Sequence, residues 1–76
     1  PFNPTTKMSL TLNTTADVSV KVFNMSGQLV DVIANGQMSS GSYSFTWDGT
    51  NVSSGVYFIQ TEIGSEIHSQ KIMLVK

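Results

Sequence analysis

The chain contains no cysteine, few charged residues and no long apolar run. Without cysteine, neither a disulfide framework nor a thiolate metal site can stabilise the fold. Charged residues make up 12% of the 76-residue chain and its net charge is −1, which argues against binding to nucleic acid or to an anionic membrane surface. No apolar run approaches the roughly 18 residues that span a bilayer. The length suits one domain.

Helical periodicity is also lacking, and alternation of apolar and polar residues takes its place. Turn-forming clusters of Gly, Asn, Asp and Ser interrupt the alternating segments at intervals of roughly 8 to 12 residues, a spacing typical of a sandwich. The sequence therefore predicts an all-β, antiparallel β-sandwich of about six or seven short strands. The main predicted strands are residues 6–12, 18–23, 28–33, 41–47, 56–59 and 67–76.

Two of these predicted strands have a less regular pattern. Residues 28–33 carry adjacent apolar residues, and we expect residues 34–36 to break that strand and Met38 to be an isolated plug between the sheets. Residues 67–76 have apolar residues on both faces. This pattern predicts a last strand that is buried between a neighbouring strand and the facing sheet.

The stretch from residue 41 to 59 holds most of the aromatic residues and the only tryptophan. Tyr43, Phe45 and Trp47 recur at period two, so their rings fall on one face of a strand. Trp47, Tyr43 and Tyr57 can form a sugar-stacking platform, but Tyr43 and Phe45 share the face of Trp47, and a face this apolar favours the core. The function that such a platform would serve, an accessory carbohydrate-binding or spacer module of a secreted enzyme, stays open as an alternative.

Candidate catalytic and metal-binding residues are few. His68 lies near Glu66 and Ser69, but a small sandwich has little room for the nucleophile, base and oxyanion hole of a catalytic site. Asp48 and Asn51 offer too few oxygens for Ca²⁺, and Asp48 is better suited to capping backbone N–H groups in a turn. We therefore expect a protein that is not an enzyme and has no metal site and no cofactor.

Five short motifs follow one another along the chain. They are Pro1-Phe2-Asn3-Pro4-Thr5-Thr6, Val20-Lys21-Val22-Phe23-Asn24 with Gly27-Gln28, Gly41 with Trp47-Asp48-Gly49, Ser54-Gly55-Val56-Tyr57, and Lys71-Ile72-Met73-Leu74-Val75-Lys76. In this order they resemble the type A C-terminal sorting domain of the type IX secretion system. Phe23 replaces the usual Tyr and the loop after Asp48 is short, which leaves open the related Ig-like domain of flagellar hook-cap proteins. The lysine-terminated end favours the sorting domain.

The resemblance implies an Ig-like fold and a targeting role. Residues 1–76 would form a single C-terminal sorting domain, excised from a larger secreted protein. Such a domain directs its cargo from the periplasm across the outer membrane to the cell surface or the medium. Its implied partners are the outer-membrane secretion machinery, a sortase-like peptidase that removes it, and the upstream cargo in the same chain. Neither nucleic acid nor direct membrane insertion is expected.

Two groups of residues carry this hypothesis. The first is a structural framework that positions the strands, and it comprises Gly27, Trp47, Asp48, Gly49, Gly55 and Tyr57. The second is a recognition segment at the chain end, and it comprises Lys71, Ile72, Met73, Leu74, Val75 and Lys76. A rigid sheet with an accessible edge can bind a partner by strand addition, and this is the docking mode that we expect of the last strand.

Overall fold

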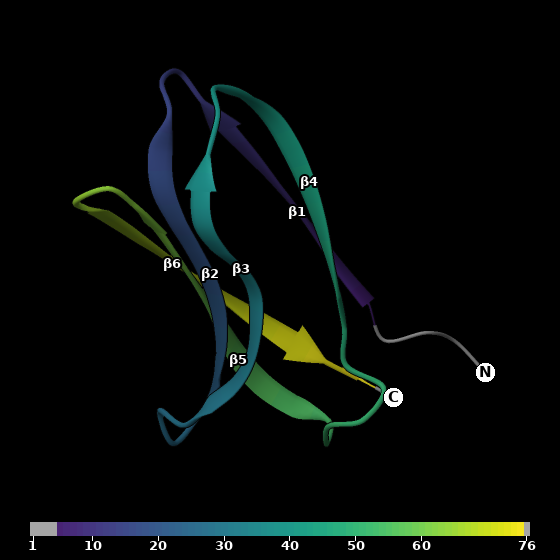
Figure 1. Cartoon of the computed structure of the whole chain (residues 1–76). Helices are drawn as coiled ribbons and strands as arrows, with labels where there is room; N and C mark the ends of the chain where they lie inside the picture. The colour runs from purple at the N-terminus through teal and green to yellow at the C-terminus, as the bar shows by residue number, and fades with distance from the viewer. Residues whose placement is uncertain (1–4, 76) are drawn as a thin grey trace.

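The structure is a computed structural model that describes residues 5–75, and over this range the chain forms six β-strands in two facing antiparallel sheets (Figure 1). The strands are β1 (Thr5–Leu12), β2 (Ala16–Asn24), β3 (Leu29–Met38), β4 (Gly41–Asp48), β5 (Gly55–Ile63) and β6 (Glu66–Leu74). β1 and β4 make a two-stranded sheet, and the other strands make a four-stranded sheet in the order β3-β2-β5-β6. The predicted all-β sandwich is confirmed.

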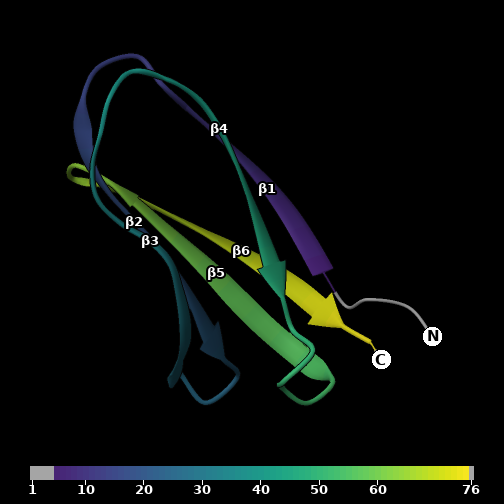
Figure 2. The same ribbon diagram turned by 45° about the vertical axis from the view of Figure 1, so that its right-hand side comes forward.

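The chain passes between the sheets at residues 13–15, 39–40 and 49–54, whereas β2–β3 and β5–β6 are hairpins within one sheet. The first two crossings lie together at one end of the sandwich (Figure 1). The third lies at the other end, beside the end of β6 (Figures 1 and 2). The two strands of the aromatic stretch at residues 41–59 therefore lie in different sheets.

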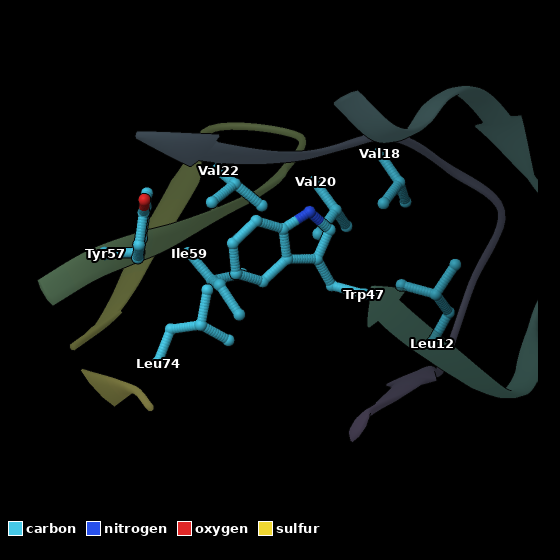
Figure 3. Close-up of a cluster of buried hydrophobic side chains, with 8 residues drawn as sticks. All are labelled: Leu12, Val18, Val20, Val22, Trp47, Tyr57, Ile59 and Leu74. Carbon is cyan, nitrogen blue, oxygen red and sulfur yellow. The ribbon is translucent and has the colours of Figure 1, made fainter. Parts of the chain in front are cut away.

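The core forms where the alternating residues of both sheets meet. Val18, Val20 and Val22 of β2 are at most 2% exposed, and Trp47 of β4 is 2% exposed. Figure 3 shows the Trp47 indole in the middle of this cluster, with side chains of the four-stranded sheet around it. The buried cluster comprises Leu12, Val18, Val20, Val22, Trp47, Tyr57, Ile59 and Leu74.

Strand β3 is longer and less regular than the sequence predicts. Its pairing with β2 shifts register twice, and each shift leaves one β3 residue without a Cα partner, first Val30 and then Ile33. Both are half-buried and pack against the core. The expectation that residues 34–36 break the strand is wrong, because the bulges absorb the irregular pattern and the strand continues to Met38. Met38 ends β3 and also packs against the core.

Strand β6 is a sheet edge, and the prediction that it is buried on both faces is wrong. It pairs with β5 alone, and residues 66–71 are all exposed. The facing sheet has only two strands, so it leaves the inward positions of β6 at Glu66, His68 and Gln70 exposed. Burial begins near the strand end, at Ile72 and Leu74.

Candidate recognition surface

The backbone of β6 presents a long, regular and open edge. All nine of its residues pair with β5 without a register shift, and its other side has no partner strand within residues 5–75. The opposite edge of the same sheet, β3, is distorted by two register shifts. Bulges hinder the addition of another strand, whereas a regular edge offers a row of free N–H and C=O groups. The geometry thus makes β6 the edge of the four-stranded sheet that is better suited to strand addition.

The side chains of the predicted recognition segment point in two directions. Lys71 and Met73 pair with Phe58 and Val56 on the outward face, and Met73 is 70% exposed. Ile72 and Leu74 point inward and pack with the core. Val75 follows the strand and is 58% exposed, and Lys76 lies outside the described residues. The segment therefore has an anchoring half and an accessible half.

Leu74 anchors the end of β6 on Gly49, in the turn that follows β4. Gly49 is buried, and a Cβ atom added to it would lie 2.7 Å from Leu74 Cδ2 and 3.0 Å from Leu74 Cδ1. Only glycine leaves room for the Leu74 side chain, which is 4% exposed. The contact gives the Trp47-Asp48-Gly49 motif a physical role, because it holds the terminal strand in place.

The connection between β4 and β5 is shaped by hydrogen bonds from its own residues. The Asp48 carboxylate accepts hydrogen bonds from the Thr50 backbone N–H at 2.9 Å and from the Thr50 hydroxyl. The Tyr57 hydroxyl donates to the Ser53 carbonyl at 2.6 Å. Gly55 starts β5 with a φ of 155°. The Asp48 carboxylate therefore caps the turn, as the sequence predicts, and Gly49 of this connection lies beside Leu74.

Trp47 is fixed by a carboxylate from a strand far away in the sequence. Its Nε1–H donates to Asp31 Oδ2 at 3.1 Å, and the other oxygen of Asp31 accepts the Val32 backbone N–H at 2.8 Å. The Trp47 ring also packs against the Tyr57 ring, with centroids 5.3 Å apart at 60°. Sequence reasoning missed Asp31, because it lies 16 residues before Trp47 and no local pattern connects them.

The β2–β3 turn contains the remaining framework glycine. Gly27 adopts a φ of 83°, a left-handed conformation that other residues rarely adopt. The Asn24 side chain accepts hydrogen bonds from the backbone N–H groups of Ser26 and Gln28, both at 2.9 Å. The turn is therefore specified by Asn24 and Gly27 together.

Comparison with known proteins identifies the family at the level of the fold. A family model described as the FlgD Ig-like domain matches residues 2–63. The chain belongs to the FlgD Ig-like domain family. No curated protein and no solved structure matches the chain. The match confirms the predicted Ig-like fold, and it ends at Ile63, the last residue of β5, so β6 lies outside it.

His68 of this Ig-like domain lies near Glu66 but does not share a face of β6 with Ser69. His68 Nε2 lies 3.5 Å from Glu66 Oε2, and the two side chains are 67% and 73% exposed. His68 occupies an inward position of β6 and Ser69 an outward one, so the two side chains point to opposite faces. Within residues 5–75, no group of three or more His, Cys, Asp and Glu side chains could hold a metal ion.

A cleft of about 460 Å³ opens between the two sheets of the Ig-like domain, where β1 faces β6. Its apolar lining includes Met8, Leu10 and Ile59, and β6 contributes His68 and Gln70. The cleft lies where the four-stranded sheet extends past the two-stranded one. In the described part of the chain, no helix has the length and apolar character to cross a membrane.

Proposed function

We propose that this Ig-like domain is a C-terminal signal that directs a cargo protein across the outer membrane by type IX secretion. The observation that carries the proposal is β6, an exposed edge strand without a bulge that is anchored by Leu74 on Gly49. The ordered motifs that resemble the sorting domains support the same function. Among them is the terminal segment from Lys71 to Lys76, which includes the end of this edge strand.

In this proposal the signal is recognised only when it is folded. The anchor residues Ile72 and Leu74 hold β6 on the core, which fixes Lys71 and Met73 on the opposite face. A strand of the outer-membrane machinery adds to the free edge and forms backbone hydrogen bonds, while the outward side chains of β6 supply specificity. A sortase-like peptidase then removes the domain, and the cargo reaches the cell surface or the medium. The domain itself catalyses no reaction.

The experiment attaches residues 1–76 to the C-terminus of a reporter that carries its own N-terminal export signal, in a bacterium with type IX secretion. Lys71→Ala/Lys76→Ala removes the two lysines of the terminal segment, of which Lys71 is exposed. We expect this variant to keep the reporter in the periplasm. Lys7→Ala is the matched control, because Lys7 is exposed on β1 in the other sheet, and it should be exported normally.

Folding must be checked for each variant, by thermal melting of the purified chain. Truncation of residues 71–76 is a poor test, since it also removes Leu74 from the core. Export of Lys71→Ala/Lys76→Ala at the wild-type level would refute the role of the terminal lysines. Failure of the wild-type chain to export the reporter would refute the secretion function.

The alternative of a carbohydrate-binding module receives no support from the three aromatic residues of the predicted sugar-stacking platform. Trp47 is 2% and Tyr57 is 6% exposed, so neither ring offers a face to a sugar. Tyr43 is half-buried, and its hydroxyl donates to the Ser39 carbonyl at 2.6 Å.

A further inference from the structure

The outward face of the four-stranded sheet has an apolar half close to the β2–β3 turn. Residues paired across antiparallel strands share a face, so the register identifies the side chains that lie there together. They are Leu29 and Val32 on β3, Phe23 and Lys21 on β2, Phe58 and Val56 on β5, and Lys71 and Met73 on β6. We call these eight residues the outer patch. Gln60 and Ser69 lie at its border, in the same row as Lys21.

The outer patch is accessible to a partner. Met73 is 70%, Leu29 is 55% and Val32 is 43% exposed. Phe23 and Phe58 are half-buried and lie directly opposite each other on neighbouring strands. Apolar side chains thus follow one another across all four strands, and a contiguous apolar area of this kind is typical of an interaction site.

Charges on this face are separated by sign. Lys21 and Lys71 belong to the outer patch, and neither forms an ion pair with any residue in the described range. The outward-facing acids, Asp17 and Glu62, lie in the other half of the sheet, where they pair with Gln37 and Ile67. The apolar half of the face therefore carries positive charge alone, and this calls for a partner with negative charge beside an apolar surface.

We infer that the outer patch docks on a protein surface of the export machinery that presents apolar side chains flanked by carboxylates. The identity of this partner rests on the proposed function, whereas its chemistry follows from the patch. Stable complexes bury roughly 1,200–2,000 Å² in total, and a patch of eight side chains falls short of this. The contact is accordingly transient, which suits a signal that is bound and then released.

Other occupants fit the patch less well. A second copy that joins patch to patch would place four lysines in one interface without a carboxylate to pair them, and an excess of like charge there is unfavourable. A lipid surface gains about 1 kcal/mol per lysine, and two lysines beside half-buried rings give little binding. A protein with acidic groups at its rim satisfies both the apolar residues and the lysines.

The test reverses charges in each half of the face within the same reporter fusion. Lys21→Glu/Lys71→Glu changes the patch, and Asp17→Lys/Glu62→Lys makes an equal number of reversals in the other half. We expect the first variant to lower export about tenfold and the second to leave it unchanged. Leu29→Ser/Met73→Ser removes exposed apolar groups without touching the core, and we expect it to lower export as well. Each variant must melt as the wild-type chain does.

The outcomes separate this inference from the proposed function. If the wild-type chain exports the reporter and all three double variants do too, the outer patch has no role in docking. An equal loss of reporter export in both charge-reversal variants would also overturn the inference, since it would show that export depends no more on the outer patch than on the other half of the face. If the wild-type chain does not export, the secretion function itself fails. Patch-dependent dimerisation in analytical ultracentrifugation, or sedimentation with phosphatidylglycerol vesicles, would assign the patch to a second copy or to lipid and overturn the inference.

Discussion

The contact between Leu74 and Gly49 predicts how strongly the terminal strand is coupled to the core. Leu74→Ala removes a side chain that is 4% exposed, a change that lowers the free energy of unfolding by about 2–5 kcal/mol in buried sites. We expect the lower half of this range, about 2–3 kcal/mol, because β6 is an edge strand that can partly close the cavity. Met73→Ala is the control on the exposed face and should change stability by less than about 0.5 kcal/mol.

This loss is large for a domain of 76 residues. At about 0.05–0.15 kcal/mol per residue, the total free energy of unfolding is about 4–11 kcal/mol. Leu74→Ala therefore removes about a fifth or more of it and should lower Tm by roughly 10–20 °C. Trp47 is the only tryptophan, and it lies in the same cluster as Leu74, so its fluorescence during urea unfolding reports the transition directly.

Gly49→Ala tests the same contact from the other side, by adding a methyl group where Leu74 packs on the glycine. The nearest atoms to an added Cβ are Cδ2, Cδ1 and Cγ of Leu74, at 2.7, 3.0 and 3.4 Å, and the buried leucine has little room to move. Overpacking of this kind costs about 1–3 kcal/mol. In the Leu74→Ala background the clashing atoms are gone, so the same methyl group should be nearly neutral. The double variant should thus lose about 1–3 kcal/mol less than the sum of the two single losses.

The double-mutant cycle formed by Leu74→Ala and Gly49→Ala has a result that would refute this reasoning. If the two losses add within about 0.5 kcal/mol, Leu74 does not cover Gly49, and the terminal strand is held by other contacts. A normal m-value in every variant is needed, since a changed slope signals a change in the unfolded or native ensemble rather than in this contact.

Three further predictions test the framework by urea unfolding. Asp31→Ala should destabilise the fold by about 1–3 kcal/mol, because it leaves the buried Nε1–H of Trp47 without its acceptor. Gly27→Ala should cost about 1 kcal/mol through backbone strain alone, since nothing lies within 4 Å of the added Cβ, and an unchanged stability would show that the turn relaxes. Tyr57→Phe should cost about 1 kcal/mol, and Tyr43→Phe should cost less, because the equivalent hydrogen bond of Tyr43 is exposed; equal losses would contradict the role of burial.

The sequence predicts the strands best where one face of the sheet is buried. Val18, Val20 and Val22 alternate with polar residues and are the most buried side chains, because period two leaves only one way to place them. The same reasoning assigns Tyr43, Phe45 and Trp47 to the core, and all three lie in or against it. The sequence also singles out the motif at residues 47–49, but the contact of this motif with Leu74 joins distant residues and has no local signal.

The errors have a common physical origin in pairing between distant segments. The bulges at Val30 and Ile33 of β3 are defined by the pairing of β3 with β2. The local sequence of β3 alone does not predict where they lie. The apolar residues of 67–76 suggested burial on both faces, but the order of strands makes β6 an edge and the facing sheet is too narrow to cover it. Position in the sheet, rather than hydrophobicity, decides which of these residues are accessible.

The edge position of β6 also explains why its alternating residues differ in kind. Inward Ile72 and Leu74 are aliphatic because they must hold a strand that has only one neighbour. Outward Lys71 and Met73 contribute little to the core. An exposed apolar residue such as Met73 promotes aggregation when it lies on a regular, uncovered edge strand. The lysine beside it counters that hazard through charge. An exposed apolar side chain next to a solubilising charge is stable in isolation and still available to a partner, and the folded core determines when both are presented together.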